Sequence, residues 1–135
     1  MEIIKTGRDI LMGYECISFA YVFGSYSSNK IRDDSDIDVA IYLEKEIDTD
    51  TYLRIKANLS QAFKKEVDLV ILNTAPPLLK YEIYKNNILL FAHDKMIESR
   101  YKVKTLFEYN DIRKYLDLSY DATIKRLKRE VELDD

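Results

Sequence analysis

Two aspartates separated by a single residue are the most informative feature of this 135-residue sequence. Asp36 and Asp38 begin an apolar run that alternates as a strand does, so both carboxylates are predicted to project from one face. Carboxylates held side by side raise each other's pKa unless a cation lies between them. Mg²⁺ prefers hard oxygen ligands and often takes one or two carboxylates plus substrate phosphates. The pattern therefore predicts a metal site, the alternative being a solvated strand end.

A Gly-Ser pair ahead of the aspartates suits the phosphate part of the same substrate. Gly24 lets the backbone approach a ligand closely, and Ser25 is predicted to open a short helix whose free N–H groups attract phosphate. Lys30 and Arg32 lie in the charged loop before Asp36 and are candidates to neutralise phosphate, the alternative being plain surface charge. Together these residues predict a site for a metal ion and a nucleoside triphosphate.

Asp68 is the natural third carboxylate. It stands alone in the apolar run 67–72, where an unpaired charge would be costly. If that run forms a strand beside the one that begins at Asp36, Asp68 joins Asp36 and Asp38; the alternative is an acid paired with Lys64 or Lys65. Three carboxylates, expected to serve two Mg²⁺ ions, and a phosphate-binding turn indicate nucleotidyl transfer by in-line attack at an α-phosphorus. Catalysis then depends mainly on positioning and charge stabilisation.

Composition narrows the class of protein. The length predicts a single domain, residues 1–135, with an α/β catalytic core over 1–94 and a helical extension over 95–135. The net charge of -3 and pI of about 5.3 argue against a general nucleic-acid coat, so direct nucleic-acid binding is not expected. A lone Cys16 excludes a disulfide framework and fits the cytoplasm. No signal peptide or membrane span is expected, because no long apolar run occurs.

The elements that must position these residues follow from hydrophobic periodicity and from turn residues. Strands 17–23 and 36–43 are expected to pair as part of an antiparallel or mixed sheet. A helix capped by Asp50 or Thr51 should precede the Asp68 strand. The tail is predicted to be one long helix or two helices with a break near 117–119. The remaining expected elements are a helix over 2–15, a turn with a short helix over 25–29, a strand over 66–72, a helix from Pro76 to Tyr84 and a strand over 88–92.

The sequence Gly24-Ser25, ten residues, then Asp36-x-Asp38 resembles the signature of the DNA polymerase β-like nucleotidyltransferases. The short chain is similar to the minimal nucleotidyltransferases, and the tail from Arg100-Tyr101 onward resembles that of the MntA-type antitoxins. The resemblance implies an α/β (α+β) fold with a small mixed sheet, flanking helices and a C-terminal helical tail. It also implies that Asp36, Asp38 and Asp68 hold Mg²⁺, while Gly24 and Ser25 hold the triphosphate of ATP.

The same resemblance implies a function and a partner. MntA-type proteins of type VII toxin–antitoxin pairs transfer AMP from ATP to a tyrosine of a HEPN-domain RNase toxin and so silence it. One departure is that many relatives carry Ala-Arg-Gly where this chain has Ser27-Ser28-Asn29, which leaves Lys30 or Arg32 to compensate for the missing arginine. Two alternatives remain open: an antitoxin that acts by binding alone, and a nucleotidyltransferase with a small-molecule or RNA acceptor.

Overall fold

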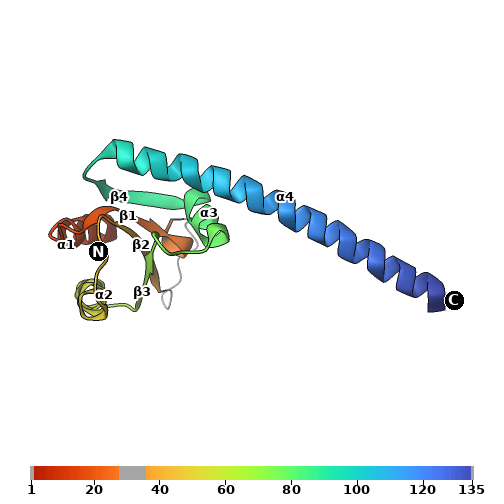
Figure 1. Ribbon diagram of the computed structural model, residues 1–135. Coiled ribbons are helices and arrows are strands. Elements are labelled where there is room, and N and C mark those ends of the chain that lie inside the picture. The colour runs from red at the N-terminus through yellow and green to blue at the C-terminus, as the bar shows by residue number, and fades with distance from the viewer. Residues whose placement is uncertain (1, 28–35, 135) are drawn as a thin grey trace.

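The computed structural model describes residues 2–27 and 36–134 and contains a four-stranded mixed sheet covered on both faces by helices (Figure 1). The strand order is β3-β2-β1-β4. β1 runs antiparallel to both of its neighbours, and β2 runs parallel to β3. The predicted mixed sheet is therefore confirmed. The strands are β1 (Ile17–Phe23), β2 (Ile37–Leu43), β3 (Val67–Ile71) and β4 (Asn87–Ala92).

Alternating side chains of the strands divide the core between the two faces of the sheet. Val39 and Ile41 of β2 pack in one cluster with residues of α1 and α2, whereas Ala40 and Tyr42 pack in a second cluster with residues of α3 and α4. Asp38 belongs to the second face, because side chains two residues apart on a strand point the same way. The helices are α1 (Ile3–Leu11), α2 (Thr49–Phe63), α3 (Pro77–Lys85) and α4 (Lys95–Asp134), with one 3-10 turn, η1 (Gly24–Tyr26).

The start of α2 corrects a prediction. The cap is Asp48 and not Asp50 or Thr51, because the Asp48 carboxylate accepts a hydrogen bond of 2.8 Å from the backbone N–H of Thr51. The last residue of the helix is Phe63, and the next residue, Lys64, has a left-handed backbone with φ 56°. α2 therefore begins slightly earlier than expected and ends shortly before β3. Asp68 is the second residue of that strand.

α4 is a single helix of 40 residues, without a break near 117–119 (Figure 1). Its first turns pack against the sheet, where Glu98 and Thr105 are buried. Its distal half projects beyond the body, and Tyr115 and Leu118 are 70% and 71% exposed there. Despite this length, no helix in the described residues is apolar enough to span a membrane.

A buried polar contact fixes α4 to the sheet. The Tyr21 hydroxyl donates a 2.9 Å hydrogen bond to Glu98, and Lys102 forms a 2.9 Å salt bridge with the same carboxylate oxygen. Burial, reinforced by the charge of Glu98, raises the pKa of Tyr21, so its hydroxyl remains a donor at neutral pH. Farther along, the Lys80–Glu108 salt bridge of 2.6 Å joins α3 to α4.

Replacing the donor of this contact should weaken the fold. Tyr21→Phe leaves the buried Glu98 carboxylate with only Lys102, and we expect the free energy of unfolding to fall by about 1–3 kcal/mol. Urea denaturation followed by circular dichroism measures this change. Tyr115→Phe, at a 70% exposed position of α4, is the matched control and should change stability by less than about 0.5 kcal/mol. Equal destabilisation by the two variants would contradict the contact's role.

Candidate active site

One row of residues crosses all four strands at a single end of the sheet. Asp68 pairs in register with Asp38, Asp38 with Phe23, and Phe23 with Asn87. This end holds the C-terminus of β1 and the N-termini of the other three strands. The turn that follows Phe23 therefore lies beside the carboxylates of β2 and β3, as a site for nucleotide and metal requires.

Gly24 is fixed in this position by two constraints. Its φ of +70° lies in the left-handed region, which side-chain-bearing residues rarely adopt. A Cβ atom added to Gly24 would also overlap the Oδ2 atom of Asp38. The backbone of the Gly-Ser turn is therefore in direct contact with a candidate metal-binding carboxylate.

Ser25 lies in η1, the single 3-10 turn after Gly24. The predicted short helix is thus limited to one turn. Its end is closed by the Gly24 carbonyl, which accepts a 3.1 Å hydrogen bond from the Ser27 N–H. The Ser27 hydroxyl lies 2.9 Å from that carbonyl and 3.0 Å from the carbonyl of Asn86, which ties the turn to the loop before β4. Phosphate binding by Gly24 and Ser25 stays a prediction.

The predicted phosphate contacts Lys30 and Arg32 lie outside the described residues, as do Ser28 and Asn29 of the departing segment. Among the described residues, the Lys65 amine lies 5.6 Å from the centroid of the ring of Tyr26, the residue that follows Ser25. From the sequence we expected Lys65 only as an alternative partner for Asp68. Lys65 directly precedes β3, and its nearness to the Gly-Ser turn is evident only when the parallel pairing of β2 and β3 is known.

Electrostatics single out Asp38 among the three carboxylates. Its pKa is raised chiefly by burial, then by the charge and hydrogen bonding of Asp68, and last by the charge of Asp36. Asp36 and Asp68 are both exposed. Asp68 is therefore not the buried charge that we expected from the apolar run around it, and its nearness to Asp38 comes from strand register.

These carboxylates fit a hard cation by their chemistry. A divalent ion beside Asp38 would favour its ionised form and counter the repulsion that raises its pKa. Within residues 2–27 and 36–134, however, no three His, Cys, Asp or Glu side chains are grouped closely enough to hold an ion as they stand. Metal binding by Asp36, Asp38 and Asp68 therefore stays a prediction.

Comparisons with known proteins agree with this geometry. The family model "Polymerase beta, Nucleotidyltransferase" matches residues 5–96, a range that includes the Gly-Ser turn and all three aspartates. The protein adenylyltransferase MntA of Shewanella oneidensis is 29% identical over 112 residues, which cover 83% of this chain and 78% of that relative.

Solved structures share the fold along nearly the whole chain. A toxin–antitoxin structure with AMP-PNP superposes with a TM-score of 0.78 at 22% identity, covering 92% of this chain and 99% of that one. A tri-AMPylated Shewanella oneidensis HEPN toxin in complex with MNT antitoxin gives a TM-score of 0.70 at 21% identity, covering 90% and 98% of the two chains. The coverage of this chain extends past residue 96, so the likeness includes part of α4.

The Gly24 backbone can be tested by adding one methyl group. Gly24→Ala forces a left-handed alanine against Asp38, so we expect a loss of about 1–3 kcal/mol in stability and a severe loss of ATP binding. Urea denaturation and calorimetric titration measure the two effects. Gly13→Ala is the control, since its added Cβ would approach only the Ile10 carbonyl, at 3.3 Å. ATP affinity that survives in Gly24→Ala would contradict the contact.

The burial and charge repulsion that raise the pKa of Asp38 predict that the stability of metal-free protein depends on pH. Because its folded pKa is raised above 3.8, stability falls as the pH rises through the folded pKa. Asp38→Asn removes that loss, so in EDTA it should be more stable than the parent at pH 7, with the advantage vanishing below the unfolded pKa. Thermal unfolding against pH measures this. Asp121→Asn, exposed on α4, should show no such profile, and a matching profile there would refute the assignment.

Proposed function

Because the chain belongs to the polymerase β family of nucleotidyltransferases, we propose that it is a protein adenylyltransferase that acts as the antitoxin of a HEPN-domain RNase. The observation that carries this proposal is the contact of the Gly24 backbone with Asp38, in register with Asp68. The relative MntA, named as a protein adenylyltransferase, supports the acceptor class. The toxin–antitoxin complexes of the same fold support the partner class.

In this proposal ATP lies across the end of the sheet where the four strands meet. Gly24 and Ser25 bind the triphosphate through backbone N–H groups, with Lys30 and Arg32 as further phosphate contacts. Asp36, Asp38 and Asp68 would hold Mg²⁺, which supplies positive charge to neutralise the triphosphate and the leaving pyrophosphate. The raised pKa of Asp38 supports this, because a cation beside that carboxylate would favour its ionised form.

The reaction is transfer of AMP to a tyrosine hydroxyl of the toxin. The phenolic oxygen forms a bond to the α-phosphorus while the bond from that phosphorus to the pyrophosphate oxygen breaks. Pyrophosphate leaves, and the phenolic proton passes to water. The residues of this chain contribute by holding the triphosphate in line with the acceptor. A rigid glycine turn suits that task, because a displacement of about 1 Å lowers such rates roughly a hundredfold.

A partner surface is offered by the distal half of α4. Large apolar side chains are exposed there, although the sheet needs none of them for its own core. Exposed apolar side chains of this size are typical of a helix that contacts another protein. They also favour a second candidate function, in which binding of the toxin alone neutralises it. The exposed residues are Tyr115, Leu116, Leu118, Tyr120 and Leu127.

The two functions are separated by removing the metal-binding charge without changing size. Asp36→Asn combined with Asp38→Asn should lower AMP transfer by at least about a thousandfold, because the triphosphate charge is no longer neutralised. The measurement uses labelled ATP, Mg²⁺ and the product of the adjacent reading frame, which the proposal identifies as the HEPN-domain toxin. Mass spectrometry of the labelled toxin identifies the acceptor residue.

The control for that experiment is complex formation, measured by calorimetry with the same double variant. We expect binding to persist while transfer and neutralisation of the RNase are lost. Absence of label on a toxin that binds the parent chain would overturn the enzymatic proposal. Full neutralisation by the double variant would favour the binding-only function. Glu44→Gln/Glu46→Gln, in the exposed loop after β2, makes the same charge change away from both the site and the proposed partner surface.

A further inference from the structure

The candidate carboxylates and α4 lie on the same face of the sheet. Val70 of β3 packs with residues of α3 and α4, and Asp68 lies two residues before Val70, so its side chain points to that face. Asp38 points to the same face, because Ala40 packs there. The acceptor of the proposed reaction is therefore expected to approach on the side of the sheet where α4 lies.

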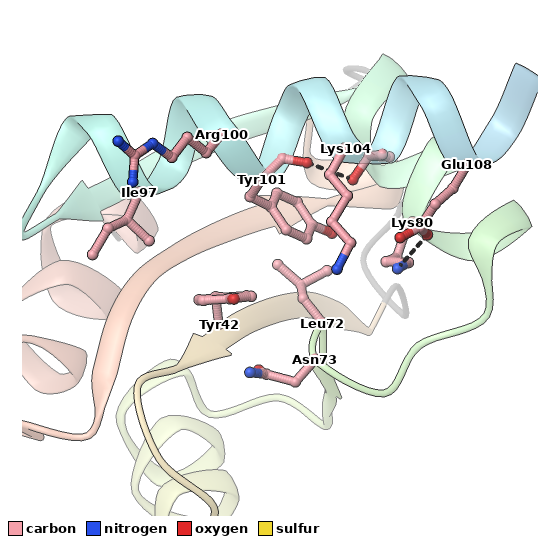
Figure 2. A pocket seen from close by; sticks show the side chains of 10 residues that line it. Tyr42, Leu72, Asn73, Lys80, Ile97, Arg100, Tyr101, Lys104 and Glu108 are labelled. Carbon is pink, nitrogen blue, oxygen red and sulfur yellow. Dashed lines mark hydrogen bonds and ion pairs between the residues drawn. The ribbon is translucent and has the colours of Figure 1, made fainter.

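α4 runs back along this face toward the carboxylates. β4 begins at the carboxylate end of the sheet and ends at Ala92, and α4 begins at Lys95, so the helix starts at the opposite end. Figure 2 shows it running in the direction opposite to β2 as far as Glu108. The part of α4 after Tyr109, residues 110–134, projects beyond the sheet and is here called the arm (Figure 1). The arm therefore extends from the end of the sheet that holds the carboxylates.

The short helix α3 connects the base of the arm to the Gly-Ser turn. The Tyr109 ring stacks on the Tyr81 ring, with centroids 3.5 Å apart and planes 8° from parallel. α3 ends four residues after Tyr81, at Lys85. The carbonyl of the next residue, Asn86, lies 3.0 Å from the Ser27 hydroxyl. These contacts set the direction of the arm relative to the carboxylates.

One side of the arm continues the buried side of α4. Glu98 and Thr105 are buried against the sheet, and a stripe of apolar residues follows them at steps of three and four, which keeps it on the same side of the helix. The stripe consists of Tyr109, Ile112, Leu116, Tyr120 and Leu127. Leu116 and Leu127 are each 45% exposed, and Tyr120 is 67% exposed. The side of α4 that packs on the sheet thus remains apolar where the sheet has ended.

The length and position of the stripe indicate what it binds. An apolar side that extends over about seven helical turns suits a helix of another protein, because the side chains of two helices can interdigitate along their whole length. Resting on the proposed function, we propose that the stripe docks an apolar helix of the HEPN-domain toxin and thereby holds the acceptor tyrosine at the carboxylate end. Docking makes the encounter of tyrosine and ATP effectively unimolecular, so the arm acts by positioning and contacts neither ATP nor metal.

The test measures AMP transfer to the product of the adjacent reading frame. Leu116→Glu/Leu127→Glu should raise the KM for the toxin at least about tenfold, because two charges would be buried in the interface. The kcat at saturating toxin and the affinity for ATP should stay within about twofold of the parent. The matched control, Leu53→Glu/Leu78→Glu, makes the same change at leucines of α2 and α3 that are 54% and 47% exposed, and its KM should equal that of the parent.

A pair of single variants tests which side of the arm binds. Leu118 lies about 200° around the helix from Leu116, so Leu116→Glu should weaken toxin binding at least about fivefold more than Leu118→Glu does. Calorimetry measures both affinities, and circular dichroism checks that helix content is unchanged. Equal losses in the two variants overturn the assignment of the stripe.

Calorimetry also separates this proposal from the enzymatic one. A parent chain that binds the toxin without labelling it overturns AMP transfer, and the docking surface is then judged by affinity alone. Parent-like affinity in Leu116→Glu/Leu127→Glu overturns the docking proposal whether or not AMP is transferred. Failure of the parent to bind the toxin overturns it as well.

Discussion

The contact between the Gly24 backbone and the Asp38 carboxylate is the constraint on which the rest of the site depends. It joins the end of β1 to the start of β2, and the parallel register then adds Asp68 from β3. The Gly-Ser turn and the carboxylates are thereby brought together by strand pairing. Nothing in this arrangement requires α4, which is consistent with a family match that ends at residue 96.

The two faces of the sheet are packed with different kinds of side chain. The face under α1 and α2 is packed with aliphatic side chains, whereas the opposite face combines aromatic packing with buried polar groups. The hydrogen bond between Tyr21 and Glu98 holds α4 against this second face. The salt bridge between Lys80 and Glu108 holds α4 against α3. A cavity lined by Tyr42, Lys80 and Tyr101 lies along the same stretch of α4.

The sequence was sufficient to predict the strands and the order of the elements because their signals are local. β1, a run of β-branched and aromatic residues that stops at Gly24, has the predicted bounds. The Asp48 cap was missed because four consecutive polar residues, 48–51, can each cap a helix. The hydrogen bond from the Thr51 N–H identifies Asp48 as the cap. Exposure of Asp68 and the left-handed φ of Gly24 arise from tertiary packing, so neither could be read from periodicity. The cavity between β2, α3 and α4 was not predicted for the same reason, since Tyr42 and Lys104, which both line it, are far apart in sequence.

The projection of α4 has a hydrodynamic consequence. The helix continues for about 25 residues after Tyr109, which at 1.5 Å per residue adds an arm of about 37 Å to a small body. Rotational diffusion of such a molecule is anisotropic, and its Stokes radius exceeds that of a sphere of equal mass. Gel filtration will therefore overstate the mass of the isolated chain, so light scattering or sedimentation is the sounder measure of how many copies assemble.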